Sequence, residues 1–305
     1  MKILFIRSNK AFLPEISAYI NYFNKTKEFQ AYDTSELSEG YDIRDFDIIW
    51  EFKGIGGCNA KDKIMVHEYA SLSTGNFPKA KNILKKYINL RPNLRLFLNN
   101  YVRKGYNFQD GVDFCYRDMG ISEIFFGQMD DAKEYEFVYI GSVSKSREID
   151  KLLKAFTKKE NRKICLIGNV EDDIYKQYKK NKNITFTGKI PYSEVPSIAS
   201  KGIYGINYIP NRYPYYLQTS TKLLEYLALG LKVITTDYQW VNEFEKKNQC
   251  SFYKLDYNNI SLDFNSIEKF NYKSQIQTED YLWDNVINKS KVKDKLLQIY
   301  IGRSE

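Results

Sequence analysis

Lys222 and Glu225 are the side chains whose types and spacing first suggest chemistry. They lie three residues apart in TSTKLLEYLALGLKVITTD (219–237), on one polar face of a predicted helix. Ser and Thr at 219–221 are good N-cap residues, and a helix start beside a lysine suits a diphosphate. A carboxylate one turn later can accept hydrogen bonds from the two hydroxyls of a ribose. The alternative is an exposed Lys–Glu pair worth roughly a few tenths of a kcal/mol, and the pattern leaves both open.

A second candidate site lies at the end of the predicted strand 137–143, in the run Gly141-Ser-Val-Ser-Lys-Ser-Arg147. Glycine lets a ligand approach the backbone, and the free N–H groups of the following helix favour an anion. Arg147 can add a bidentate phosphate contact. The chain has neither GxGxxG nor GxxxxGK[ST], which excludes the classical dinucleotide and P-loop sites. The alternative is an ordinary strand–helix turn with surface cations, which composition alone favours.

Elements that alternate between strand and helix must position these residues. The expected strands are 2–7, 46–52, 63–69, 94–99, 137–143, 163–168, 183–188, 203–209 and 233–236. The expected helices between them are 14–24, 79–89, 146–156, 171–181 and 193–200. This order predicts parallel sheets covered on both faces, with ligands at the carboxyl ends of the strands.

A polar, aperiodic stretch at 128–136 marks the expected domain boundary. We therefore predict a first domain over 1–130, a second over 131–277, and a C-terminal amphipathic helix within 278–305 that packs back on the first domain. The apolar positions of this helix lie along one side between 278 and 300.

Composition narrows the function classes. A chain of 305 residues suffices for about two domains. Its single histidine excludes any mechanism that needs two. The four cysteines form no CxxC pair, which argues against a structural zinc site or a disulfide framework and fits a reducing cytosol. No apolar run approaches the roughly 20 residues that span a bilayer. The N-terminal apolar stretch is short and no small-residue cleavage site follows it, so we expect a first strand rather than a signal peptide.

The net charge of +8 is compatible with an acidic partner. A phosphorylated ligand, an anionic membrane and a nucleic acid would each fit, and so would a lysine-rich surface without a partner. The basic residues are spread over many elements and no RNA or DNA motif appears, so we expect no nucleic-acid partner.

Four segments resemble landmarks of one enzyme family. TKLLEYLALGLKVITTD (221–237) looks like the donor-site signature of GT-B glycosyltransferases, similar to family 4 or group 1: Lys or Pro, two apolar residues, Glu, then A-x-G-x-P-V-I. Three further landmarks match in order and spacing, in FVYIGSVSKSREIDKLLKAF (137–156), CLIGN (165–169) and ITFTGKIPYSEVPSIASKGIYGINYIP (184–210). The resemblance covers 137–240. It implies an α/β fold of two Rossmann-like domains, the GT-B architecture, with a cleft between them and a long C-terminal helix.

The resemblance also implies roles in the second domain, which would bind a nucleotide-sugar donor. Glu225 would hold the ribose, and Arg147 would contact the diphosphate. Lys189 and Ile190 would offer backbone groups to the base. The other donor-binding residues are Lys222, Ser220, Thr221, Gly141 and Ser142.

Two positions depart from the family pattern. Ser142 stands where the family has an arginine after the glycine, and Leu217 replaces a glutamate that commonly contacts the donor sugar. In the acceptor-side first domain, His67 in VHEY resembles the family's active-site histidine, the alternative being a core or surface histidine. Gly56 and Gly57 follow one strand there, Glu68 lies near the end of the next, and these three are the acceptor-side candidates.

The implied reaction moves a hexose from a nucleotide-diphosphate sugar to an acceptor hydroxyl, usually with retention, and needs neither metal nor cofactor. A UDP-sugar is expected ahead of a GDP-sugar. The expected acceptor is a saccharide or lipid-linked molecule of bacterial surface polysaccharide or glycolipid synthesis. The alternatives are a catalytically silent GT-B subunit that partners an active transferase, or a nucleotide-sugar epimerase on the same fold.

Residues 79–95 carry six basic side chains and no acid, together with an apolar stripe. We expect the stripe to pack on the core with the lysines in solvent. The alternative function is contact with an anionic membrane surface, and the two can hold together. The expected location is therefore cytoplasmic, with peripheral attachment to the inner face of the cell membrane as an option.

Overall fold

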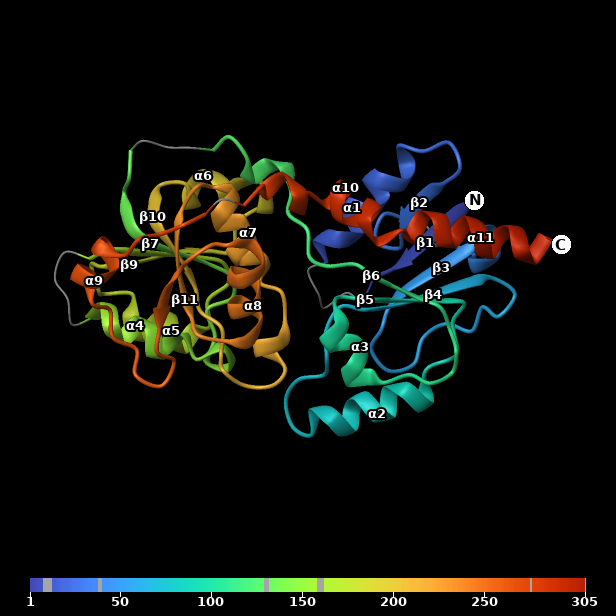
Figure 1. The fold of residues 1–305 in the computed structure, drawn as a ribbon, viewed down its shortest axis with the longest axis horizontal. Coiled ribbons are helices and arrows are strands. Elements are labelled where there is room, and N and C mark those ends of the chain that lie inside the picture. The colour runs from blue at the N-terminus through green and yellow to red at the C-terminus, as the bar shows by residue number, and fades with distance from the viewer. Residues whose placement is uncertain (8–12, 38–39, 129–131, 158–161, 275, 305) are drawn as a thin grey trace. The chain divides into compact units, whose positions relative to one another are not determined.

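The computed structural model of the chain describes residues 1–7, 13–37, 40–128, 132–157, 162–274 and 276–304. It forms two compact units (Figure 1). The first unit comprises Met1–Gly120 and Leu282–Glu305, and the second comprises Ile121–Tyr281. The predicted α/β class is confirmed, because each unit is a six-stranded sheet whose neighbouring strands are all parallel.

The sheet of the first unit has the order β2-β1-β3-β4-β5-β6. Its strands are β1 (Lys2–Ile6), β2 (Gln30–Asp33), β3 (Ile48–Phe52), β4 (Ile64–Tyr69), β5 (Leu94–Phe97) and β6 (Phe114–Tyr116). The accompanying helices are α1 (Pro14–Asn24), η1 (Ile43–Asp45), α2 (Pro78–Ile88), α3 (Asn100–Tyr106), α10 (Trp283–Ser290) and α11 (Val292–Ser304). The central strands are buried on both faces, which explains their near-continuous apolar runs.

The sheet of the second unit has the order β12-β11-β10-β7-β8-β9. Its strands are β7 (Tyr135–Ile140), β8 (Ile164–Ile167), β9 (Ile184–Gly188), β10 (Gly202–Asn207), β11 (Lys232–Thr236) and β12 (Tyr253–Leu255). Its α-helices are α4 (Ile149–Thr157), α5 (Asp172–Tyr178), α6 (Val195–Ala199), α7 (Thr221–Ala228), α8 (Gln239–Asn248) and α9 (Phe264–Lys269). Its 3₁₀ turns are η2 (Glu123–Phe125), η3 (Lys145–Arg147), η4 (Tyr192–Glu194), η5 (Tyr215–Leu217) and η6 (Thr278–Tyr281).

Alternate residues of β7 point to opposite faces of this sheet and join two separate cores. Val138 and Ile140 pack with α6, α7 and α8, whereas Phe137 and Tyr139 pack with α4, α5 and α9. This alternation is the period of two that a strand imposes.

The boundary that we expected near residue 130 falls outside the described residues. The compact units divide after Gly120 instead. The physical reason is that Ile121 and Phe125 are fully buried in the core of the second unit.

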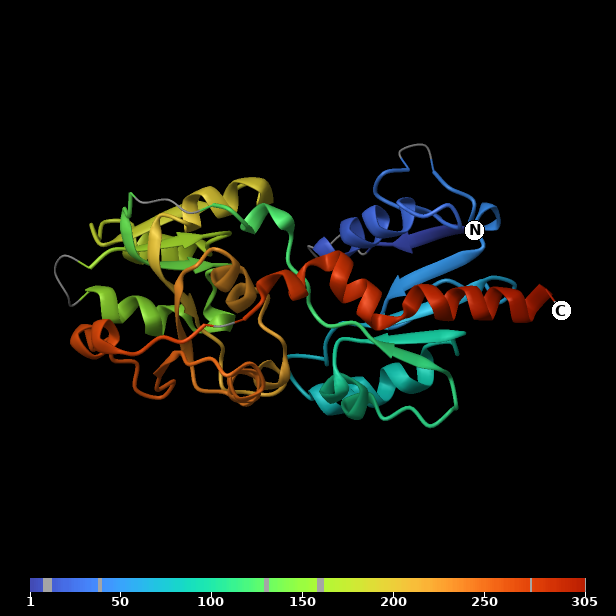
Figure 2. The same ribbon diagram turned by 45° about the horizontal axis from the view of Figure 1, so that its top comes forward.

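The C-terminal segment differs in one respect from the single helix expected over 278–300. Lys291 adopts a left-handed backbone conformation with φ of 59°, which ends α10 before α11 begins. Figure 2 shows the two helices following one another along the first unit. Trp283, Ile287 and Leu296 join the core of that unit.

The apolar stripe of 79–89 corrects a second expectation, since it does not pack on a core. Of the residues in α2 only Asn82 is buried, while Ile83, Leu84, Tyr87 and Ile88 are exposed.

Candidate functional site

The second unit has a topological switch point at β7. Its neighbours are β8 on one side and β10 on the other, so the chain leaves β7 and β10 toward different sides of the sheet. Ligands of open parallel sheets bind outside the carboxyl ends of strands at such a point. The two segments that meet there are Gly141–Arg147, which follows β7, and the segment from β10 to α7.

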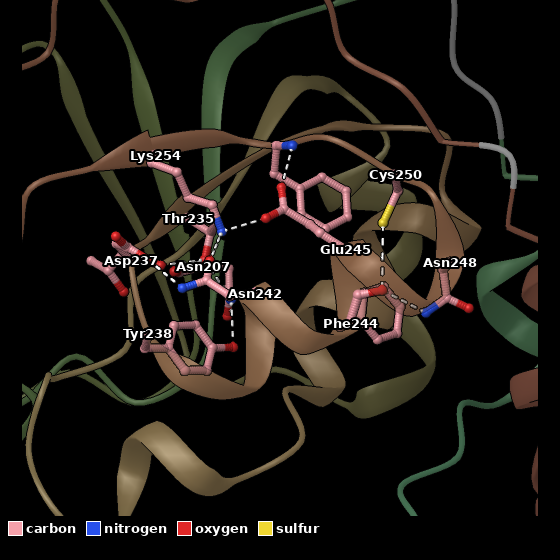
Figure 3. Close-up of polar contacts among 12 residues, drawn as sticks. Asn207, Thr235, Asp237, Tyr238, Asn242, Phe244, Glu245, Asn248, Cys250 and Lys254 are labelled. Atoms are coloured by element: carbon pink, nitrogen blue, oxygen red, sulfur yellow. Dashed lines mark hydrogen bonds and ion pairs between the residues drawn. The ribbon is translucent and has the colours of Figure 1, made fainter.

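Buried polar contacts fix the start of α7. Ser220 is its N-cap, and its Oγ accepts a hydrogen bond from the Leu223 N–H at 3.3 Å. The same hydroxyl donates to Asn207 Oδ1 at 2.6 Å. Asn207 Nδ2 donates in turn to Thr235 Oγ1 at 2.9 Å and to Tyr238 Oη at 3.0 Å, as Figure 3 shows. The Ser220 hydroxyl is already hydrogen-bonded to Leu223 and Asn207. A ligand at this position would therefore bind to the backbone N–H groups at the start of α7.

Tyr226 locks the middle of α7 onto the two strands at the switch point. Its hydroxyl accepts from the Ile140 N–H at 2.8 Å and donates to the Ile206 carbonyl at 3.3 Å. The ring lies against Gly205, where an added Cβ would come within 2.3 Å of it. The side chains on the opposite face of the first turn of α7 are therefore held on a rigid support.

Lys222 reaches across to the end of β7. An added Cβ at Gly141 would lie 2.6 Å from Lys222 Cε, so glycine makes room for the lysine stem. Lys222 Nζ donates to Tyr139 Oη at 3.4 Å and lies 4.9 Å from the centre of that ring. The backbone of Gly141 has φ of 133°, which L side chains rarely adopt.

Glu225 is buried one turn further along, with 4% of its surface exposed. Its Oε1 accepts a hydrogen bond from Tyr192 Oη at 2.8 Å. Tyr192 begins η4, three residues after Lys189, so the segment after β9 borders the same site. Lys189 is exposed and Ile190 is half-buried.

Burial perturbs both titrating groups of this pair. It raises the pKa of Glu225 to about 7, against the Tyr192 hydrogen bond and the charge of Lys222, which favour the carboxylate. Burial, together with the positive charge of Arg147, lowers the pKa of Lys222 to about 7. Burial thus favours the neutral form of both groups. Perturbed pKa values of this kind are typical of functional sites.

The positive charge of Arg147 acts on Lys222 and contributes to its lowered pKa. Arg147 ends η3 and is half-buried, while Ser142 is exposed in the turn before it. Thr221, the first residue of α7, is half-buried. The structure thus places Gly141 against Lys222, which shares α7 with Glu225, while Arg147 acts on Lys222 through its charge.

Sequence reasoning missed three contributors to this site. Tyr192 carries the hydrogen bond to Glu225, and Tyr139 lies beneath the Lys222 ammonium group. Arg212 joins the two segments, since its guanidinium donates to the Ser146 carbonyl and lies 3.9 Å from Glu148 Oε1. The alternation in FVYI places Tyr139 opposite Ile140, but nothing in the sequence indicates how far Tyr192 or Arg212 reaches.

In the first unit, the structure corrects the assignment of Glu68 to the acceptor side. Its side chain is 1% exposed and forms an ion pair with Arg117. Glu68 Oε2 also accepts from Trp50 Nε1 at 2.9 Å. Arg117 donates from Nε to Tyr19 Oη at 3.0 Å and lies 3.6 Å from Glu15 Oε1. Glu68 is thus part of a buried charge network that holds the core together.

His67 is likewise enclosed, which fits the core alternative and not the active-site position that the resemblance implied. It lies within β4 with no exposed surface, and its Nε2 is 3.4 Å from Glu51 Oε2. Burial lowers its pKa, so the imidazole is neutral near pH 7.

The loop with Gly56 and Gly57 wraps over the same Glu51. The Gly56 carbonyl accepts from Lys53 Nζ at 2.5 Å. Gly57 has φ of 136°, and an added Cβ there would meet the Glu51 carboxylate at 2.5 Å. These two glycines therefore shape a closed turn over charged side chains.

Replacing Gly141 with alanine should lower the free energy of unfolding by about 1–3 kcal/mol, because the residue would be strained at its positive φ. The new methyl group should also displace Lys222. Urea denaturation measures the first effect. Gly111→Ala is the control, since its φ of 71° is also positive but nothing lies within 4 Å of the added Cβ. Equal loss of stability in Gly141→Ala and Gly111→Ala would contradict the close packing described above.

Two further properties concern the described residues only. No helix within the described ranges is both long and apolar enough to cross a bilayer. Nor does this part of the chain contain three or more His, Cys, Asp or Glu side chains grouped to hold a metal ion.

Comparisons with known proteins agree with this architecture. Among solved structures, the chain is similar to AviGT4, a glycosyltransferase involved in avilamycin A biosynthesis (TM-score 0.65, 9% identity, 99% of this chain and 98% of the other). It is also similar to Anabaena Alr3699/HepE in complex with UDP and glucose (TM-score 0.61, 10% identity, 100% of this chain and 99% of the other). A third similar structure is the Methanocaldococcus jannaschii UDP-GlcNAc 2-epimerase in complex with UDP-GlcNAc and UDP (TM-score 0.55, 10% identity, 95% of this chain and 99% of the other). At such identities these likenesses establish the fold.

A search among curated protein sequences found no match. The family model described as "Glycosyl transferases group 1" matches residues 121–275, which is half of the chain and nearly all of the second unit. The matched stretch contains the whole cluster around Lys222 and Glu225. On this match, the chain belongs to the group 1 glycosyl transferases.

Proposed function

We propose that the protein transfers a hexose from a nucleotide-diphosphate sugar to a hydroxyl of a saccharide or lipid-linked acceptor. The observation that carries this proposal is the cluster of Gly141, Arg147, Lys222 and Glu225 at the switch point of a group 1 domain. A UDP-sugar is the preferred donor and a GDP-sugar the second choice. The solved complexes of HepE and of the epimerase contain UDP, which supports a uridine nucleotide by analogy.

Each member of the cluster has a role that its chemistry suits. The ammonium group of Lys222, the guanidinium of Arg147 and the N–H groups at the start of α7 hold the diphosphate. Gly141 lets the phosphates approach the backbone. The Glu225 carboxylate accepts from the ribose hydroxyls, and the backbone of Lys189 and Ile190 contacts the base.

The same groups act on the transition state. Negative charge develops on the diphosphate as the bond to the sugar breaks, and cations already in place stabilise it. The departing phosphate oxygen takes the proton of the acceptor hydroxyl, and the outcome is retention. No step of this scheme requires a metal, so activity should survive EDTA. We assign no proton transfer to His67, because its side chain has no exposed surface.

UDP affinity should have a maximum near pH 7. Above it, Lys222 loses its proton and its attraction for the diphosphate, since its pKa is lowered to about 7. Below it, Glu225, whose pKa is raised to about 7, gains a proton and accepts hydrogen bonds less well. Each limb should approach a tenfold loss per pH unit.

Calorimetric titration with UDP between pH 5.5 and pH 9 measures this profile. Lys222→Met should flatten the alkaline limb. The acid limb that remains in Glu225→Gln reports the phosphate of UDP itself, which also titrates near pH 6. An alkaline limb that is the same in the wild type and in Lys222→Met would exclude the lysine assignment.

The proposed activity is tested by incubating the protein with radiolabelled UDP-hexoses and GDP-hexoses, with and without candidate acceptors. Slow hydrolysis of one donor, with faster release of the nucleotide and transfer of the labelled sugar when an acceptor is present, supports the transferase. Conversion of UDP-GlcNAc to its 2-epimer without release of UDP would favour an epimerase. Donor binding without any turnover would favour a silent subunit, for which Ser142 and Leu217 are the sequence argument.

A further inference from the structure

Helix α2 presents its polar side to the protein. Asn82 is buried, and its Oδ1 accepts from the Ser73 N–H at 2.9 Å. Lys85 Nζ donates to Tyr106 Oη at 3.5 Å, and Lys86 Nζ donates to the Asn107 carbonyl at 2.7 Å. An amphipathic helix of a water-soluble domain normally does the reverse and buries its apolar stripe.

The apolar side of α2 consequently faces outward. Its exposed members, with Phe77 just before the helix and Leu90 just after it, are Phe77 (81% exposed), Ile83 (58%), Leu84 (46%), Tyr87 (76%), Ile88 (49%) and Leu90 (36%). We call this set the α2 face. In Figure 1 α2 lies outside α3. Contiguous exposed apolar side chains of this kind mark a surface that binds a partner.

Ile55 extends the α2 face. Asn89, directly after the helix, accepts from the Gly56 N–H at 3.0 Å and donates from Nδ2 to the Gly54 carbonyl at 3.1 Å. Ile55 lies between these two bonded residues and is 55% exposed. The helix and the loop are thus held together as one surface.

The segment that carries the α2 face has charge of one sign. Between Glu68 and Asp110 the chain contains eight Lys and Arg residues and no Asp or Glu. At 100° per residue, the exposed Lys79 and Lys81 fall on the two borders of the apolar stripe. Apolar side chains bordered by lysines complement a partner whose interior is apolar and whose surface groups are anionic.

We propose that the α2 face docks on an anionic lipid bilayer. The helix would lie in the plane of the membrane with its apolar side chains among the acyl chains and Lys79 and Lys81 at the headgroups. A second copy of the chain fits less well, because a symmetric contact would set lysines against lysines. The attachment needs no nucleotide, so it stands or falls independently of the proposed transferase activity.

Co-sedimentation with vesicles tests this proposal. The full chain is mixed with vesicles of phosphatidylcholine alone, or of phosphatidylcholine with one quarter phosphatidylglycerol, at low and at high salt. Binding is expected to the anionic vesicles only, and to weaken with salt. Ile83→Glu should reduce the partition about tenfold or more, because it removes an apolar side chain that would enter the acyl chains and adds a charge of the same sign as the lipid.

Two matched controls separate the α2 face from general surface effects. Ile301 on α11 is 58% exposed like Ile83, so Ile301→Glu should bind as the wild type does. Lys79→Gln with Lys81→Gln should lower the partition about thirtyfold, since each lysine near the membrane contributes about fivefold. The same change at the exposed Lys176 and Lys180 should not.

Three results would overturn the proposal. The first is a wild-type chain that binds neither vesicle. The second is Ile83→Glu binding as tightly as Ile301→Glu. The third is a dimer in size-exclusion chromatography that Ile83→Glu dissociates, which would make a second copy the occupant of the α2 face.

Discussion

Replacing Glu225 with alanine should weaken UDP binding about 100-fold while the protein stays folded. Hydrogen bonds to a charged group contribute about 1.5–3 kcal/mol each, and the carboxylate would lose its bonds to the ribose hydroxyls. The side chain is buried beside the start of α7, where a ligand at the switch point would lie. Calorimetric titration with UDP measures the loss, and circular dichroism verifies the fold.

Tyr192→Phe is the matched control for this prediction. It removes the hydroxyl that bonds to Glu225 Oε1 and leaves the carboxylate in place. UDP affinity should change less than about tenfold, since the ribose contact itself is intact. If folded Glu225→Ala bound UDP as tightly as the wild type, the ribose contact would have to be assigned elsewhere.

Replacing Glu68 with alanine should lower the free energy of unfolding by about 3–5 kcal/mol, the largest stability effect that we expect. The change leaves Arg117 buried with its main counter-charge removed, and it takes the acceptor from Trp50 Nε1. Arg117 is among the largest fully buried side chains of the first unit, so water cannot compensate. Chemical denaturation with urea gives the value directly.

The double variant Glu68→Leu with Arg117→Met separates lost charge pairing from lost packing. It removes both charges of the ion pair, and Glu15, whose pKa burial already raises, can take up a proton. We expect it to be more stable than Glu68→Ala. A Glu68→Ala protein as stable as the wild type would instead free Glu68 for the acceptor-side role that the sequence suggested.

The main strands and helices were predictable because their signals are local. The apolar runs of β1, β3, β4, β7 and β8 and the caps around α7 encode these elements directly. The short edge strands β2, β6 and β12 were missed. A strand of three or four residues carries too few alternations to be recognised, and it forms because a neighbouring strand offers hydrogen bonds.

The candidate site was predictable where chemistry and position coincide. Lys222 and Glu225 share a helix face, so their proximity follows from spacing alone. Contacts between distant segments were not predictable, as with Tyr192, which approaches Glu225 from 33 residues away. The burial of His67 and Glu68 was not predictable from the sequence either. Both are residue types common in functional sites, but tertiary packing encloses both side chains.

The α2 stripe shows the same limit from the opposite direction. Helical periodicity correctly identified one apolar side and one lysine-rich side. Which side faces the protein depends on partners far away in sequence, such as Tyr106 and Asn107, which receive the lysines of α2. A sequence pattern defines two faces of a helix, and only the packed structure assigns one of them to solvent.

The cluster at the switch point of the second unit is proposed to bind a nucleoside diphosphate. The decisive experiment is calorimetric titration of the purified protein with UDP, GDP, ADP and CDP, each with and without EDTA. We predict saturable binding of one of them, with UDP favoured, which is insensitive to EDTA and is weakened in Glu225→Ala. Failure of all four nucleotides to bind would contradict the account and leave the cluster as a relic of the family fold.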